Sequence, residues 1–158
     1  MKEENPYALL LEEVKIGPVV APNRFYQVPH CTGMGYGSPN TLAAMREVKA
    51  EGGWGVVCTE YCSIHPSSDD TPMPHASLWD ENDVRAQAKM VDKVHAHGSL
   101  AGVQLWHGGS TSSNLYTREI SIGPQSRPVW GSDPVQCRAM DKSDIRALRE
   151  WQRAAARR

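Results

Sequence analysis

The feature that most constrains the fold of this chain is the regular alternation of apolar, strand-like segments with amphipathic helical ones. Each loop that follows a strand is long, whereas each loop that follows a helix is short. This asymmetry is typical of an α/β fold whose parallel strands carry a working face at their C-terminal ends. The expected strands are residues 24–29, 54–61 and 99–107, and the expected helices are residues 38–52, 81–98 and 141–158.

The apolar patterns indicate which surfaces are buried. In residues 54–61, "WGVVCTEY", both alternating sets are apolar, which predicts a parallel strand covered on two faces. A hairpin-like opening is expected before the first strand, in residues 11–23. The residues expected on the buried helix faces are Leu42, Met45 and Val48, then Val84, Ala88, Val91 and His95, and finally Ile145, Leu148 and Trp151.

Two α/β architectures fit this order of elements. A doubly wound sheet that binds a dinucleotide would need a G-x-G-x-x-G fingerprint after the first strand, but Gly33, Gly35 and Gly37 miss that spacing. A closed barrel needs about 250 residues. Three units in 158 residues cannot close such a barrel, so the pattern by itself indicates a piece of a parallel α/β fold.

Charge and hydropathy exclude several classes of protein. The chain has 17 Lys and Arg residues against 18 Asp and Glu residues among its 158, so it has no field that would gather nucleic acid or an anionic membrane. No signal peptide is recognised in residues 1–17, and no apolar run approaches the length of about 20 residues that spans a bilayer. A cytoplasmic protein is expected.

The titratable residues give few signals of their own. The four cysteines are expected to be reduced thiols, because no two of them have C-x-x-C spacing, and no metal site is expected. Asp69 and Asp70 are interpreted as a solvated loop pair, and the acidic residues in 80–83 as helix caps. Cys31 stands at the end of the first strand, where composition alone predicts a packed thiol.

Several motifs in order along the chain carry a family resemblance. They are "NRFYQVPHCTG", "KAEGGWGVVCTEYCSIHPSSDD", "LWDENDVR" and "GSLAGVQLWHGG". With them the sequence resembles the trimethylamine dehydrogenase family, the iron-sulfur flavoprotein branch of the old yellow enzyme group. The resemblance implies that the chain is the N-terminal portion, about three βα units, of an FMN-binding (β/α)8 TIM barrel, so that residues 1–158 form an incomplete FMN-binding barrel domain. In full-length relatives a 4Fe-4S segment and nucleotide-binding domains follow, and these are not present in the 158 residues.

The resemblance also implies roles for particular residues. The cysteine that matches Cys31 joins its sulfur covalently to C6 of the flavin, and Pro29 and His30 are expected beside the cofactor. Gln104 is expected to hydrogen-bond the pyrimidine edge of the flavin, because an amide offers both a donor and an acceptor. Tyr61 is expected to bind substrate, since aromatic faces attract methylated ammonium groups.

One motif departs from the trimethylamine enzyme. That enzyme has Glu and Tyr where this chain has Gln104 and His107, so "QLWHGG" looks closer to old yellow enzyme and dienoyl-CoA reductases. His107 is kept as a candidate substrate-binding residue. No catalytic residue is expected within the chain, because the family's catalytic Tyr and His lie on the next strand, beyond Arg158.

The function implied is FMN-dependent oxidative N-demethylation of a small methylated amine, similar to trimethylamine or dimethylamine, with electrons passed to an iron-sulfur cluster. An electron-transfer flavoprotein or similar acceptor, and a homo-oligomeric state, are expected for the full-length protein. One alternative is an NAD(P)H-dependent ene or 2,4-dienoyl-CoA reductase. Another is an inactive fragment that binds no flavin.

Overall fold

The computed structural model describes residues 5–72, 75–132 and 134–158. The helices are α1 (Pro39–Glu51), α2 (Glu81–His95) and α3 (Lys142–Arg157), with single 3-10 turns η1 (Ala8–Leu11), η2 (Pro66–Ser68) and η3 (Gly109–Thr111). The strands are β1 (Val14–Ile16), β2 (Val19–Ala21), β3 (Tyr26–Gln27), β4 (Val56–Ser63), β5 (Ala76–Ser77), β6 (Leu100–Trp106), β7 (Ile122–Gly123), β8 (Arg127–Pro128) and β9 (Gln136–Ala139).

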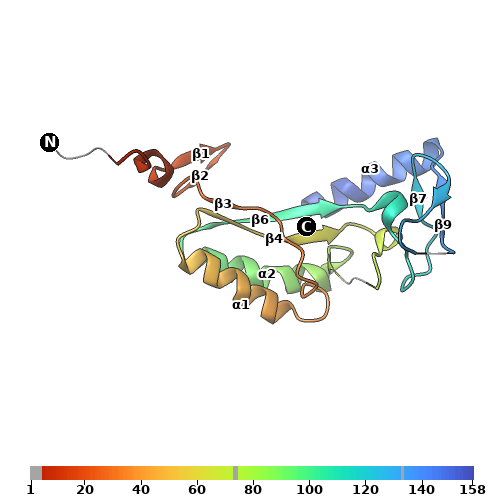
Figure 1. Cartoon of the computed structure of the whole chain (residues 1–158), viewed down its shortest axis with the longest axis horizontal. Coiled ribbons are helices and arrows are strands. Elements are labelled where there is room, and N and C mark those ends of the chain that lie inside the picture. Colours follow the sequence, from red (N-terminus) through yellow and green to blue (C-terminus); the bar gives the residue numbers. More distant parts are fainter. Residues whose placement is uncertain (1–4, 73–74, 133) are drawn as a thin grey trace.

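A parallel sheet built around β4 organises the chain. β3, β5 and β6 all pair with β4 in the parallel sense, and each of β3, β4 and β6 is followed by one of the three long helices. Helices α1 and α2 run side by side along the sheet, and α3 lies beside β6 (Figure 1). This is the strand–helix order of the first units of a (β/α)8 barrel, as the sequence predicts.

The two faces of the sheet are buried by different elements. On the outer face Val57 packs in one apolar cluster with residues of α1 and α2. On the inner face Val56 and Cys58 pack against Ala21 of the β1–β2 hairpin. Tyr61 is the one residue of β4 that is not fully buried, so the prediction of a strand covered on both faces is confirmed.

A bulge in β4 changes which side chains point inward. Val57 and Cys62 both belong to outer clusters, although five positions separate them and a regular strand would place them on opposite faces. The register between β4 and β6 shifts between Cys58 and Tyr61, and this irregularity resolves the conflict. Tyr61 therefore lies beside its register partner Gln104, on the face opposite to the helices.

The helix boundaries follow the predicted signals, but the buried faces follow them only in part. Asp80 caps α2 and Asp141 closes a capping box on α3. The prediction for Val48 is wrong, because it is 64 % exposed. In α2 the buried residues are Gln87, Met90 and Val94, whereas Ala88 and His95 are exposed. The face turned to the sheet is thus shifted by about one position, toward the long Met90 side chain.

The long loop before α3 contains strands that the sequence did not predict. In it β7 pairs with β9 in parallel and β8 pairs with β9 in the antiparallel sense. These strands lie beside η3 at one end of the molecule, while the β1–β2 hairpin lies at the other end (Figure 1). Among the described residues, no helix combines the length and apolar character that crossing a membrane requires.

Candidate functional site

A buried carboxylate fixes the loop that follows β3. The Glu60 side chain is fully buried on the β4 bulge, and its Oε2 accepts hydrogen bonds from Thr32 N (2.7 Å), Thr32 Oγ1 (2.9 Å) and Gly33 N (3.0 Å). Its Oε1 accepts from Gly35 N and from Ala76 N, each at 2.9 Å. One carboxylate therefore ties the loop after β3 to β5, and charge-assisted bonds of this kind are strong.

The approach is so close that the loop needs glycine at residue 35. A Cβ on Gly35 would lie 2.4 Å from Oε1 of Glu60 and 2.6 Å from Cβ of Ala76. Neither neighbour has room to move, because both are fully buried. The glycine is thus required by packing against the carboxylate rather than by a phosphate-binding turn.

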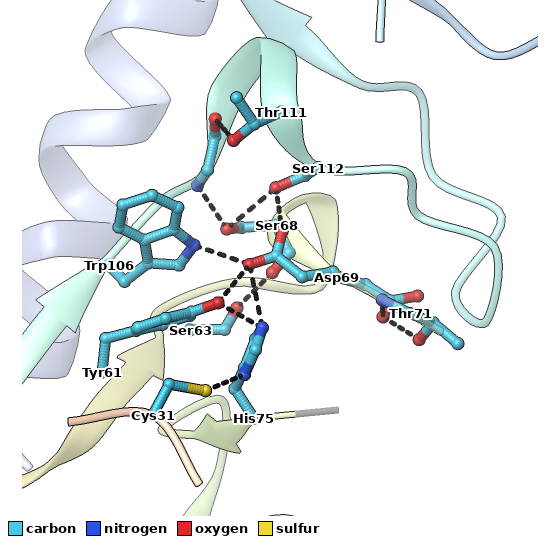
Figure 2. A network of polar contacts seen from close by, with 12 residues as sticks. Cys31, Tyr61, Ser63, Ser68, Asp69, Thr71, His75, Trp106, Thr111 and Ser112 are labelled. Atoms are coloured by element: carbon cyan, nitrogen blue, oxygen red, sulfur yellow. Dashed lines mark hydrogen bonds and ion pairs between the residues drawn. The ribbon is translucent and has the colours of Figure 1, made fainter. Parts of the chain in front are cut away.

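This fixed loop presents Cys31 to solvent. Cys31 is the one exposed cysteine of the chain's four, since Cys58, Cys62 and Cys137 are buried. Its Sγ lies 2.8 Å from Nδ1 of His75 (Figure 2). Partial desolvation raises the pKa of the Cys31 thiol, and the amide of Gly33 opposes that effect. The sequence placed Cys31 at a strand end; the structure adds a histidine partner.

His75 connects the thiol to Tyr61 and Asp70. Its Nε2 contacts the Tyr61 hydroxyl (Figure 2). The same nitrogen lies 3.6 Å from Oδ2 of Asp70, and Tyr61 donates to that Oδ2 at 3.2 Å. The side chains of His75 and Asp70 are only 8 % and 10 % exposed. Burial lowers the pKa of His75, although Asp70 opposes this.

Asp70 is a buried acceptor at the centre of this network. Its Oδ2 also accepts from Trp106 Nε1 at 2.9 Å, and its Oδ1 accepts from Ser112 Oγ at 2.7 Å. The neighbouring Asp69 is 7 % exposed and accepts from the backbone amides of Tyr116 (2.8 Å) and Thr117 (2.9 Å). The interpretation of Asp69 and Asp70 as a solvated pair is therefore wrong: both carboxylates organise loops at the strand ends.

Tyr61 lies in an aromatic corner. Its ring centroid is 4.2 Å from that of His75 and 4.8 Å from that of Trp106. Burial first, and then the charge of Asp70, raise the pKa of Tyr61 strongly, so its hydroxyl stays protonated. Such a corner offers ring faces and a hydroxyl to a small cationic group.

The residues on the inner face fit a flavin. Gln104 is exposed beside Tyr61, and within the described part of the chain no protein group hydrogen-bonds its side-chain amide. An unengaged amide can both donate to and accept from the polar edge of a flavin ring. The exposed thiol of Cys31 lies in the same network as Tyr61. This part of the chain therefore offers a flavin an unengaged amide and an exposed thiol.

The other predicted residues are placed differently. His30 is exposed, and its backbone carbonyl accepts a hydrogen bond from the buried Arg46, while Pro29 is half-buried. His107 does not join the Tyr61 network: its Nε2 lies 3.1 Å from Ser67 Oγ, and its ring lies parallel to that of Trp151 on α3. The roles of these residues stay predictions.

Sequence reasoning missed Glu60, Asp70, His75 and Trp106 as members of this site. One signal was available for two of them, because His75 and Asp70 stand in a long loop after a strand, where functional residues concentrate. Nothing in the local sequence places His75 against Cys31, which is 44 residues away.

Three comparisons place the chain among known proteins. Residues 10–158 match the NADH:flavin oxidoreductase / NADH oxidase family. The chain is 49 % identical over 124 residues to dimethylamine dehydrogenase of Hyphomicrobium sp. (strain x), covering 78 % of this chain and 17 % of that protein. It is 30 % identical over 134 residues to putative 12-oxophytodienoate reductase-like protein 2A of Arabidopsis thaliana, covering 83 % and 47 %.

A solved structure gives the same picture. Histamine dehydrogenase from Rhizobium sp. 4-9 superposes with a TM-score of 0.92 at 47 % identity, covering 97 % of this chain and 22 % of that one. The chain therefore has the fold of the N-terminal part of that flavoprotein barrel, and it spans only about a fifth of the length of its amine dehydrogenase relatives.

Proposed function

The chain belongs to the NADH:flavin oxidoreductase / NADH oxidase family, and on that premise we propose that it is the N-terminal part of the FMN-binding barrel of an amine dehydrogenase. The observation that carries the proposal is the exposed Cys31 in one network with Tyr61, in a chain 49 % identical to dimethylamine dehydrogenase over most of its length. The substrate class is a small methylated amine, and Tyr61 would face its cationic nitrogen.

Four residues of this chain are assigned roles in binding the cofactor. Cys31 would hold the flavin covalently through its sulfur, Gln104 would hydrogen-bond the polar edge of the ring, and Pro29 and His30 would flank it. When bound, FMN supplies the two-electron acceptor for oxidation of the amine. Glu60 keeps the Cys31 loop in place, because it accepts four of its bonds from Thr32, Gly33 and Gly35.

The proposal extends to the rest of a full-length protein. Electrons leave through a 4Fe-4S cluster to an electron-transfer flavoprotein or a similar acceptor, and nucleotide-binding domains complete a cytoplasmic homo-oligomer. The barrel residues that complete the active site lie outside this chain, so the 158 residues alone have no turnover.

The test mixes full-length protein anaerobically with candidate reductants and follows the visible absorbance of the flavin. Rapid bleaching by dimethylamine or trimethylamine, with little response to NADPH, is expected. A second candidate is an NAD(P)H-dependent ene reductase, favoured by Gln104 and His107 in "QLWHGG" and by the 12-oxophytodienoate reductase-like relative. Bleaching by NADPH and not by the amines would replace the first function with the second.

A further inference from the structure

The arrangement around Cys31 contains a base as well as a nucleophile. We propose that His75 is the general base that takes the proton of the Cys31 thiol, and that Tyr61 and Asp70 hold His75 in the tautomer this requires. The inference deepens the proposed function, since a cysteine that attacks a flavin must first lose its proton. Nothing in the family resemblance or in the motif around Cys31 points to His75.

The geometry begins at the sulfur. Cys31 Sγ and His75 Nδ1 are 2.8 Å apart, within reach for direct proton transfer (Figure 2). His30 is next to Cys31 in the sequence, but its side chain is exposed and its backbone carbonyl is bound by Arg46. Among the described residues, the imidazole hydrogen-bonded to the Cys31 thiol is that of His75.

The direction of each hydrogen bond follows from Asp70. A carboxylate only accepts, so the Tyr61 hydroxyl, 3.2 Å away, donates its proton to Asp70 Oδ2. The oxygen of Tyr61 is then free to accept from Nε2 of His75, which it contacts. A neutral imidazole that carries its proton on Nε2 has a lone pair on Nδ1, and Nδ1 is the atom that faces Cys31.

Asp70 is itself held by groups other than Tyr61 and His75. Trp106 Nε1 donates to Oδ2 at 2.9 Å and Ser112 Oγ donates to Oδ1 at 2.7 Å. With these bonds Asp70 keeps its position when the proton moves. The order of thiol, imidazole and buried acceptor is that of a nucleophile, its base and an orienting group.

The charges that face the pair favour a neutral resting state. The charges that act on Cys31 are the carboxylates of Glu60 and Asp70 and the guanidinium of Arg46, and desolvation is the largest influence that raises the pKa of its thiol. His75 faces Asp70, Glu60 and the Tyr61 hydroxyl, and burial is the largest influence that lowers its pKa. At neutral pH the thiol therefore still has its proton, and the imidazole is free to accept it.

The step is a simple proton transfer. The S–H bond of Cys31 breaks, an N–H bond forms at His75 Nδ1, and the products are a thiolate and an imidazolium. Asp70 lies 3.6 Å from Nε2 and stabilises the positive charge on the ring. No electron changes place, so the step needs no oxidant.

Alkylation of the native chain tests the base without any flavin. Iodoacetamide is added from about pH 5.5 to about pH 9, and the modified fraction of the tryptic peptide 25–46, in which Cys31 is the one cysteine, is followed by mass spectrometry. In the reaction the S–C bond forms, iodide leaves and His75 keeps the proton. The rate is expected to rise as His75 loses its own proton, and to level off below the pH at which an ordinary thiol ionises.

Substitutions separate a base from a mere neighbour. His75→Gln should slow alkylation at neutral pH by at least about tenfold, and its rate should rise only where the thiol ionises unaided. Added imidazole should restore part of the lost rate in His75→Ala, which an effect on folding alone would not allow. Asp70→Asn and Tyr61→Phe should each slow the reaction less. His95→Gln, on the exposed last turn of α2, is the matched control.

An unchanged pH profile of Cys31 alkylation in His75→Gln, or a larger loss of alkylation rate in His30→Gln than in His75→Gln, would overturn the inference. A second arm adds FMN to full-length protein and measures flavin that stays with the denatured polypeptide. If alkylation depends on His75 but no flavin is retained, the base is supported and the covalent part of the proposed function fails. If flavin is retained at an unchanged rate in His75→Gln, the base is refuted and the attachment stands.

Discussion

Two histidine clusters lie at the C-terminal ends of neighbouring strands and differ in their partners. In the thiol cluster, His75 lies between Cys31 and the Tyr61–Asp70 pair. In the indole cluster, His65 stacks on Trp151 with ring centroids 3.6 Å apart, and His107 lies parallel at 6.0 Å. Burial lowers the pKa of the histidine in both.

The difference lies in what surrounds each imidazole. Ser67 joins His65 and His107 by hydrogen bonds, and the flat face of Trp151 covers both rings. No carboxylate of the described residues hydrogen-bonds either ring. The contacts of the indole cluster are the stacked rings, and these pack α3 against the strand ends. A lowered histidine pKa is therefore no sign of chemistry by itself. A nucleophile on one side and an orienting acceptor on the other distinguish the thiol cluster.

The largest expected effect on stability is that of replacing Glu60, whose carboxylate anchors the loop that carries Cys31. Glu60→Gln places an amide NH2 against backbone N–H donors and removes charge-assisted bonds, so the free energy of unfolding should fall by about 3 kcal/mol. Urea unfolding followed by circular dichroism measures it. In the control Glu47→Gln, which loses a half-exposed contact with Lys93, the change should stay below about 1 kcal/mol. Equal effects would show that Glu60 is no anchor.

The next effect concerns the indole cluster. Trp151→Ala removes a half-buried ring that covers His65 and His107, and we expect it to lower the free energy of unfolding by about 2 kcal/mol. Trp130→Ala is the matched control, because Trp130 is 78 % exposed. Alkylation of Cys31 should proceed at the wild-type rate in both variants. A slower reaction in Trp151→Ala would mean that the two clusters are coupled.

The dependence of stability on pH has the same sign in both clusters. Burial holds the pKa values of His65, His75 and His107 below their ordinary value of 6.5. At a pH between the folded and unfolded pKa values of these histidines, the unfolded chain binds more protons than the folded chain. The stability that the neutral histidines contribute is therefore complete above about pH 6.5 and is lost as the pH falls through the folded pKa values. Urea midpoints between about pH 7 and about pH 5 should show this decline.

A double variant assigns that decline to its cluster. His65→Gln with His107→Gln should flatten part of the pH dependence and leave the contribution of His75. If the double variant keeps the whole slope, protonation of the indole cluster does not govern the acid side of the stability curve.

The smallest expected effect is on the start of α3. Asp141→Ala removes a side chain that accepts from the amides of Ser143 and Asp144, and the melting temperature should fall slightly. In Asp141→Asn, which keeps a capping oxygen, the melting temperature should fall less. A decrease as large as that of Trp151→Ala would contradict the view that stacking, rather than capping, fixes α3.

The sequence predicts the frame of this fold better than its details. β4 is predicted because its residues are apolar on both faces, and β6 because it is another apolar run. α2 is predicted from its apolar spacing and the acidic caps in residues 80–83, and α3 from the spacing of Ile145, Leu148 and Trp151. The bulge beside Glu60 is not predictable in this way, because it depends on the loop that the carboxylate binds. The small strands before α3 are too short to show a period.

The residues of the candidate site were likewise predicted only in part. Cys31, Tyr61 and Gln104 were predicted from motifs, and the structure places Tyr61 both in the network of Cys31 and beside Gln104. His75 and Asp70 were not, since their roles arise from contacts between distant segments. The motifs single out Cys31, Tyr61 and Gln104, whereas the contacts that His75 and Asp70 make with them are visible only in three dimensions.

Mass spectrometry of the tryptic peptide 25–46 from denatured full-length protein tests directly whether Cys31 is bonded to the flavin. This peptide is expected to carry the mass of FMN on Cys31. Cys31→Ser should abolish the modification, whereas Cys137→Ser, a change at a buried thiol, should not. An unmodified peptide, with all flavin released on denaturation, would contradict the assignment of Cys31 as the point of attachment.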